Sequence, residues 1–272
     1  MVFLCLLAAL MLLERWRPRR PQPVARGRDD LRNILLGGIS AIAAVLATPI
    51  LWALTIITIN SRDWGLFSWF ALPPWLEVVA CIILLDMAIY WQHRFFHWQP
   101  MLWKVHRVHH TDVSLGATTG VRFHPIEIFL SVLIKTAVII LLGAPALAVL
   151  IFEILLNASS LFEHSNLRLP ASVDKKLRTV IVTPDMHRVH HSIYRHETDS
   201  NFGFCLSIWD RLFSSYIAQP RDDHLHMQIG QPQFPQAQGL AALLLQPFYA
   251  PQSTAYDASP SPNPEPPDNN HA

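Results

Sequence analysis

Long apolar runs separated by short polar segments dominate the first part of the chain and predict membrane-spanning helices. The run over 33–59 carries no charged residue and can cross about 30 Å of hydrocarbon at about 1.5 Å per residue. A second helix is predicted over 75–92. A helical hairpin is predicted over 126–142 and 146–162, with its bend at the "GAP" of 143–145. These segments predict about four transmembrane helices, arranged as two helical pairs.

The polar segments between these runs predict the side of the membrane that each end faces. The first 13 residues are apolar but shorter than the roughly 17 to 25 that a spanning helix needs, which predicts an interfacial anchor retained on the mature chain. The next loop is rich in arginine, which predicts a cytoplasmic location. Its arginines are Arg15, Arg17, Arg19, Arg20, Arg26, Arg28 and Arg32. The loop over 60–75 has one arginine and three tryptophans, as is typical of an aromatic belt at the opposite interface.

Composition agrees with a membrane protein and excludes several classes of function. Of the 272 residues, 51% are hydrophobic and 15% are charged, well below the quarter typical of soluble domains. The net charge is +1, so nucleic acid is not a predicted partner. Cys5, Cys81 and Cys205 are scattered without a CxxC motif, which argues against a disulfide framework or a thiolate metal site. Any bound metal must therefore be held by histidine.

The histidines form three short clusters with helical spacing. The first has the spacing HxxxH, which on a helix places both rings on one face, about 40° apart. The spacing HxxHH occurs twice, and it spreads three rings over about 100°, so each triplet can converge on one site without leaving its helix. These candidate ligands are His93, His97, His106, His109, His110, His187, His190 and His191.

The number of rings predicts two metal ions, because one tetrahedral zinc uses at most four ligands. Imidazole suits iron, copper, nickel and zinc alike, so the ligand set alone does not name the metal. His164, at the end of the hairpin, is a further predicted ligand, whereas His124 is either a ligand or a helix cap and hydrogen-bond donor. The remaining histidines lie outside the pattern and are expected in the core or on the surface: His196, His224, His226 and His271.

Several charged residues have positions that suggest supporting roles. Imidazole ligands generally donate their second nitrogen to a carboxylate or carbonyl. The carboxylates adjacent to the clusters are Asp86, Asp112, Asp185 and Glu163. For Asp86, which lies inside a predicted span, a hydrogen bond between helices is an equal alternative. Lys135 and Glu153 each lie nine residues from the hairpin bend, so they are predicted to form an intramembrane ion pair on facing arms. The alternative is that Glu153 faces the active-site cavity while Lys135 extends to the membrane surface.

Six segments together are similar to the fatty acid hydroxylase family, also called the sterol desaturase family. They are "LLDMAIYWQHRFFH", "LWKVHRVHH", "FHPIE", "FEHSN", "TPDMHRVHH" and "NFGFCLSIWDRLFSSY", within about 82–216. The resemblance implies a membrane oxygenase with a histidine-bound centre of two iron ions, which uses dioxygen to hydroxylate or desaturate a lipid. Zinc is an alternative metal in the isolated protein. By motif, the eight cluster histidines and His164 would be the ligands, while Ser160 stands where some members have a further histidine. Water, a carboxylate or His124 would then complete the site.

The sequence thus predicts an all-α integral membrane protein with a cytoplasmic, histidine-rich helical cap, in a bacterial inner membrane or an endoplasmic-reticulum-type membrane. The predicted divisions are an anchor and first span over 1–74, a catalytic domain over 75–217 and an extension over 218–272, disordered from about 251. Without a flavin, haem or nicotinamide motif, electrons would come from a separate reductase, ferredoxin or cytochrome. The alternatives are a zinc-binding membrane protein and a zinc-dependent lipid hydrolase.

Overall fold

The computed structural model describes residues 2–59 and 64–249, with side chains for 2–46 and 64–249. In these ranges the chain is all-helical, with isolated β-bridges in its loops. The long helices are α1 (Val2–Trp16), α2 (Arg26–Ile59), α3 (Pro74–Trp98), α4 (Pro100–His110), α5 (Pro125–Leu142) and α6 (Ala146–His164). The short helices are η1 (Leu66–Trp69), η2 (Ala117–Val121), α7 (Ala171–Leu177), α8 (Pro184–His190), α9 (Arg195–Thr198), α10 (Ile208–Leu212), α11 (Leu240–Leu245) and η3 (Gln246–Phe248).

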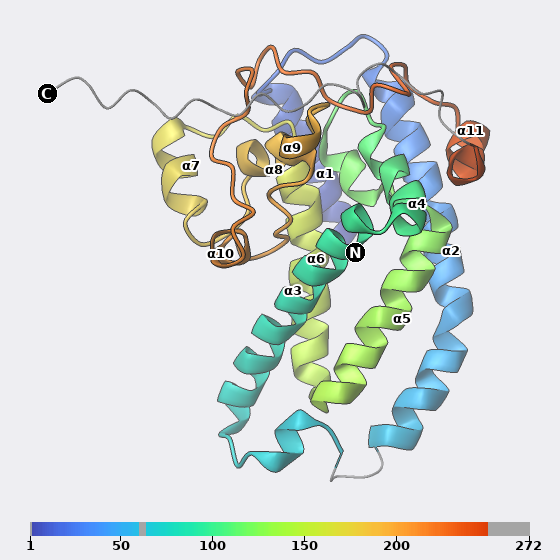
Figure 1. The fold of residues 1–272 in the computed structure, drawn as a ribbon, viewed down its shortest axis with the longest axis vertical. Helices are drawn as coiled ribbons and strands as arrows, with labels where there is room; N and C mark the ends of the chain where they lie inside the picture. The colour runs from blue at the N-terminus through green and yellow to red at the C-terminus, as the bar shows by residue number, and fades with distance from the viewer. Residues whose placement is uncertain (1, 60–63, 250–272) are drawn as a thin grey trace, which may run out of the picture.

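Among the described residues, α3, α5 and α6 are long and apolar enough to cross a membrane. They extend from a compact end formed by the shorter helices, and α2 runs beside α5 (Figure 1). The predicted hairpin is present, but its arms α5 and α6 diverge from the bend instead of packing along their whole length (Figure 1). The loop of η1 lies at the same end as the hairpin bend, far from the compact end (Figure 1).

Proline and glycine set the helix boundaries that matter for the site. Pro74 and Pro125 stand in the first turns of α3 and α5, where a missing backbone N–H costs nothing. α3 continues six residues beyond the predicted end at 92, and Pro100 then begins α4 after a sharp corner. This corner turns the second histidine cluster back toward the first. At the hairpin bend, Gly143 has φ 68°, the left-handed conformation that a helix C-terminus favours.

The hairpin bend is held by the neighbouring loop. A Cβ on Gly143 would lie 2.6 Å from the carbonyl oxygen of Trp64, so only glycine fits this contact. Trp64 also donates its indole N–H to the Ile140 carbonyl at 3.1 Å. Beyond the bend, apolar residues of α3 and α6 form the main core, with Leu85 and Phe152 almost wholly buried. Packing of α3 against α6 leaves α5 free to stand apart from α6.

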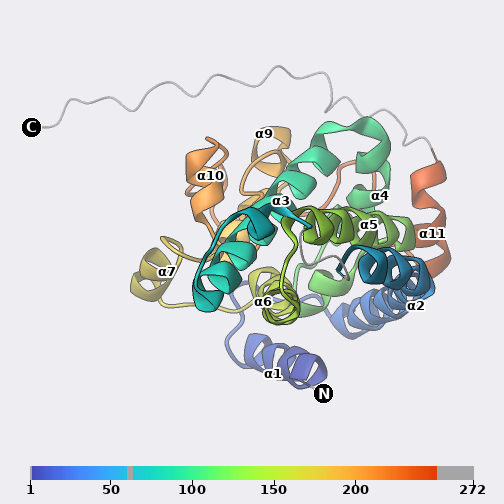
Figure 2. The same cartoon turned by 90° about the horizontal axis from the view of Figure 1, so that it is seen from below.

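The N-terminal segment is packed into the compact end. Helix α1 lies along α6 (Figure 2), and its buried Glu14 accepts backbone hydrogen bonds from Ala117 at 2.9 Å and Asn166 at 2.8 Å. The arginine-rich loop is partly buried and makes contacts with other segments. Arg26 is buried and pairs with Asp30 at 2.9 Å, and it also donates to Thr118 at 3.1 Å. These contacts join the first 30 residues to the segment that follows α4.

Candidate metal centre

Nine buried histidines converge in two adjacent groups, and within each group the nearest ring nitrogens lie within 4.8 Å of one another. The five-ring group is His93, His97, His106, His110 and His190. The four-ring group is His109, His164, His187 and His191. The rings of His110 and His191 stack at a centroid distance of 4.5 Å, so the two groups share a boundary. The structure therefore brings together the eight cluster histidines and His164.

Each HxxHH motif divides its rings between the groups, contrary to the expectation that a triplet would converge on one site. Helix α4 sends His106 and His110 to the five-ring group and His109 to the four-ring group. Helix α8 and the residue after it do the reverse, because His187 and His191 join the four-ring group while His190 joins the five-ring group. In each motif, the two rings that are four residues apart belong to the same group, and the remaining ring belongs to the other group.

Several Nε2 atoms of neighbouring rings face one another at short distances. His164 Nε2 lies 2.9 Å from His109 Nε2 and 3.0 Å from His187 Nε2, and His106 Nε2 lies 3.2 Å from His110 Nε2. The Nε2 atoms of His93, His97 and His190 are buried, with no hydrogen-bond partner among the described residues. Buried nitrogen lone pairs that converge in this way need a shared cation, so the residues fit the donor set of a metal site.

Hydrogen bonds on the opposite ring nitrogen set the tautomer of several ligands. The Nδ1–H groups of His93, His190 and His164 donate to the carbonyls of Phe202, Ser200 and Ser160. The distances are 2.9, 2.7 and 2.6 Å respectively. Because a carbonyl can only accept, Nδ1 carries the proton and Nε2 keeps its lone pair for a metal.

Two carboxylates that the sequence reasoning missed contact the five-ring group. Glu127 Oε1 lies 2.6 Å from His106 Nδ1, and Asp199 Oδ1 lies 3.3 Å from His97 Nδ1. Glu127 stands in the first turn of α5, three residues after His124, within the quoted segment "FHPIE". The proline that begins α5 indicated a helix start, and that signal could have drawn attention to Glu127 in the first turn. Asp199 follows α9, and no local pattern linked it to the metal ligands.

Burial keeps five histidines of the two HxxHH motifs neutral. It lowers the pKa of His109, His110, His187 and His191 well below the ordinary value, and neighbouring imidazoles lower it further. Burial also lowers the pKa of His190, to about 3. Only the neutral ring has the lone pair that a metal requires, so these rings are in the ligating form at neutral pH.

His124 lies outside both groups. It is the N-cap of α5, where its Nδ1 accepts from the Ile126 N–H at 3.2 Å and its Nε2–H donates to the Leu244 carbonyl at 3.1 Å. Both ring nitrogens are thus used in the cap, which matches one of the two alternatives left open by the sequence. Among the histidines outside the predicted pattern, His196 and His226 are exposed and His224 is buried. His271 and the predicted disordered tail lie outside the described residues.

The carboxylates proposed to support the ligands have other partners. Asp86 accepts from the Cys205 and Leu206 backbone and from the Trp209 indole at 2.8 Å, and so joins α3 to the segment around α10. Asp112 accepts from Asn33 and Thr119 at 2.8 and 2.7 Å. Burial raises the pKa of Asp112, but the charges of Arg122 and Arg26 outweigh that effect and hold the pKa below its ordinary value. These residues support the helices that carry the rings.

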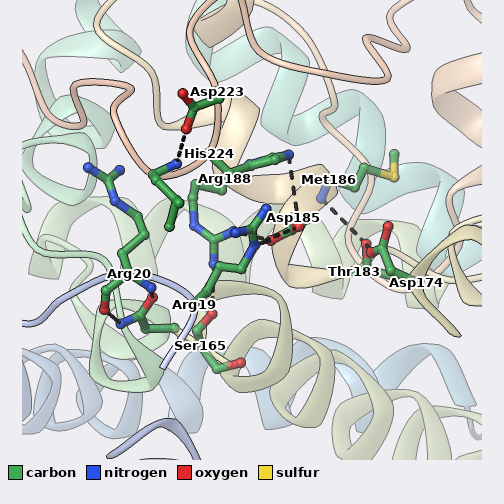
Figure 3. Close-up of polar contacts among 12 residues, drawn as sticks. Arg19, Arg20, Ser165, Asp174, Thr183, Asp185, Met186, Arg188, Asp223 and His224 are labelled. Carbon is green, nitrogen blue, oxygen red and sulfur yellow. Dashed lines mark hydrogen bonds and ion pairs between the residues drawn. The ribbon is translucent and has the colours of Figure 1, made fainter. Parts of the chain in front are cut away.

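Asp185 connects the arginine-rich loop to α8. Figure 3 shows Arg19 and Arg188 both reaching its carboxylate. Arg19 Nε donates to the two carboxylate oxygens at 3.1 and 3.0 Å, and Arg188 is wholly buried. Thr183 caps α8 by accepting from the Met186 N–H, and its hydroxyl donates to Asp174 at 2.6 Å (Figure 3). The position of α8, which contributes rings to both groups, therefore depends on contacts with residues before α2.

Glu163 is the remaining acidic candidate, and it lies beside the four-ring group. Its carboxylate is wholly buried, 3.6 Å from His164 Nδ1 and 4.0 Å from His187 Nδ1. Neither of its oxygens has a hydrogen-bond partner in the part of the chain that the structure describes. Within that same part, the Nδ1 atoms of His109, His187 and His191 are likewise buried without partners. The four-ring group is therefore less completely hydrogen-bonded than the five-ring group.

An apolar cavity of about 570 Å³ reaches the five-ring group from between the helices. Residues of α1, α2, α3, α5 and α6 line it, and His93 and His106 form part of its wall. Ser160, one helical turn before His164, brings the cavity wall next to the four-ring group. Lys135 Nζ and Glu153 Oε1, 2.5 Å apart, also line the cavity. The predicted ion pair is therefore present, and Glu153 faces the cavity as in the alternative, but Lys135 pairs with Glu153 and does not extend away from it.

Comparisons with known proteins identify relatives that oxidise lipids or sterols. The chain is 28% identical to the ornithine lipid hydroxylase OlsE of Rhizobium tropici over 91% of this chain and 74% of that protein. It is 28% identical to human alkylglycerol monooxygenase over 78% of this chain and 46% of that protein. It is 29% identical to the Delta(7)-sterol 5(6)-desaturase of Eremothecium gossypii over 52% of this chain and 37% of that protein. The chain therefore spans less than half of the last two relatives. No solved structure matches it.

The family comparison covers the histidine clusters and the helices that carry them. The model of the fatty acid hydroxylase family matches residues 78–215, half of the chain. This range contains both histidine groups and most of α3, together with α5 and α6. The relatives named above are oxidoreductases by their names. From its residues 78–215 and these relatives, the chain belongs to the fatty acid hydroxylase family.

Proposed function

We propose that this protein is a membrane-bound, dioxygen-dependent di-iron oxygenase that hydroxylates or desaturates a lipid C–H bond. The observation that carries the proposal is the placement of two all-histidine groups beside an apolar cavity. The nine histidines of the two groups would hold the metal ions. When bound, the metals would supply the redox chemistry with dioxygen that side chains lack. The names of the relatives support a lipid as the substrate class.

The residues of this chain would bind, orient and protect. The Nδ1–H groups of His106, His93 and His190 donate to Glu127, Phe202 and Ser200, respectively. These hydrogen bonds hold the rings so that each Nε2 would point to the metal. Apolar residues of α2, α5 and α6 would enclose a hydrocarbon chain and exclude water from the reacting carbon. The wall formed by His93 and His106 would bring that carbon next to the five-ring group.

The proposed topology has α2 as a fourth span beside α3, α5 and α6, with the metal centre on the cytoplasmic side. The arginines of the N-terminal loop support this side, because positive residues favour the cytoplasm. Residues 75–217 would form the catalytic domain, 1–74 the anchor and first span, and 218–272 an extension. A bacterial inner membrane or an endoplasmic-reticulum-type membrane suits this arrangement. A separate electron-donor protein would supply the electrons.

The test is lipid oxidation in cells that express the protein. Membrane lipids should gain an oxygen atom or lose two hydrogens, and a hydroxyl product should carry the isotope when labelled dioxygen is supplied. Mass spectrometry of the lipid extract measures both. His110→Ala should abolish the product, whereas His196→Ala, on an exposed ring, should not. Purified protein that contains zinc alone and hydrolyses lipid would establish the hydrolase alternative, and zinc binding without turnover would establish the binding alternative.

A further inference from the structure

The ion pair within the cavity offers unused hydrogen-bonding groups to a bound molecule. Lys135 Nζ contacts Glu153 Oε1 at 2.5 Å, which uses one ammonium proton and one carboxylate oxygen. The Lys135 side chain is 17% exposed and that of Glu153 is 36% exposed. Asn157 donates its amide to the Glu153 carbonyl at 2.8 Å and leaves its own amide oxygen as an acceptor on the same wall. Donors and acceptors therefore occur side by side in an otherwise apolar cavity.

The pair and the metal ligands line the same cavity. Glu127, which contacts His106, and Lys135 are both on α5, eight residues apart, which corresponds to about 12 Å along the helix axis. Between them, Gln92 donates to Ser131 at 2.9 Å and keeps a buried amide oxygen without a partner. A chain that extends from the five-ring group to the ion pair would thus meet polar groups at two places.

We propose that Lys135 and Glu153 recognise an uncharged group with both a hydrogen-bond donor and an acceptor, a hydroxyl or a secondary amide, within the lipid substrate. This inference rests on the proposed function and deepens it. A lysine–glutamate pair has no net charge, so a charged ligand would leave one charge uncompensated in an apolar cavity. A neutral group can accept from Lys135 and donate to Glu153 at the same time. Held there, it would place a carbon about 12 Å away beside His93 and His106.

The test measures binding and needs no turnover. The probes share one chain length and differ in their polar group: hexadecanol, N-methylhexadecanamide, methyl hexadecanoate, hexadecanoate and hexadecane. Each competes with radiolabelled hexadecanol on the full-length protein in detergent. The alcohol and the amide should bind about tenfold more tightly than hexadecane, as expected for a hydrogen bond to a charged group. Methyl hexadecanoate can only accept a hydrogen bond, so its affinity should lie between those of hexadecanol and hexadecane. Equal binding of all probes would overturn the proposal.

Variants separate recognition from a structural role. Lys135→Leu combined with Glu153→Leu should remove the preference for the alcohol, whereas the exchange Lys135→Glu with Glu153→Lys should retain part of it. Glu153→Gln leaves Lys135 without its counter-charge, so hexadecanoate should become the tightest probe. An unchanged preference in the double-leucine variant would overturn the proposal.

The outcome is separable from that of the proposed function. Metal content and gel filtration report whether each variant is folded, independently of probe binding. If the wild-type protein oxidises lipid but binds all probes equally, the recognition proposal alone fails. If the probes show the expected order but the wild-type protein forms no oxidised lipid, the proposed function fails and the recognition site stands.

Discussion

The two histidine groups differ in ring number, in hydrogen bonding and in access. In the five-ring group, His93, His97, His106 and His190 each have an acceptor on Nδ1. In the four-ring group, His164 has such an acceptor, and its three companions do not. Rings of the five-ring group also form part of the cavity wall. The group whose rings form part of the cavity wall is therefore the one in which four of five rings are held in orientation by a hydrogen bond on Nδ1.

Replacing one histidine of either group, in separate variants, should have the largest effect on metal content and activity. If each group binds a metal ion, His110→Ala should lose the metal of the five-ring group and His191→Ala that of the four-ring group, because each ring belongs to one group. Elemental analysis of the purified variants should show about half the wild-type metal in each, and lipid oxidation should fall to background in both. If one variant retains wild-type oxidation, the two groups do not act together.

Weakening the support of one ring should have an intermediate effect. Glu127→Gln replaces the carboxylate that accepts from His106 at 2.6 Å, and such outer contacts are worth about 10- to 100-fold in metal affinity or activity. Asp199→Asn should cost less, because its contact to His97 is 3.3 Å and its side chain is 39% exposed. Metal titration and initial rates of both variants provide the measurement. The reverse order would show that ring support does not follow the contacts in the structure.

Adding a histidine beside the four-ring group should have the smallest effect on metal content. Its main effect should be that the metal is retained longer. Ser160 is one turn before His164 on the same helix face, and it lines the cavity. Ser160→His should slow the loss of metal to a chelator and reduce lipid oxidation, because the new ring would occupy space next to the cavity. Ser160→Ala is the matched control and should leave the retention of metal unchanged. Equal chelation rates in both variants would show that a ring at position 160 does not reach a metal held by the four-ring group.

Much of the local structure follows from the sequence because its cause is local. Apolar runs, prolines and Gly143 predicted the spanning helices and the bend of the hairpin, and i,i+4 spacing predicted which histidines share a face. Where contacts with other segments determine the partner of a side chain, the predictions were incomplete. Asp112 and Asp185 were expected next to the metal ligands, but each is bound to other residues. Asp86 makes a hydrogen bond between helices, the second of the two alternatives that its sequence position left open. Proximity along the chain did not indicate which acceptor each ring would find.

Helical spacing and apolar length are local properties, so they predicted nine histidines near the ends of apolar helices. The division of the rings of each HxxHH motif between two groups depends on how α4 and α8 face each other, and therefore on tertiary packing. It also decided that Glu127 supports His106 and that His124 caps a helix. Helical periodicity fixes the angle between neighbouring side chains, whereas the partner of each side chain depends on packing between segments distant in sequence.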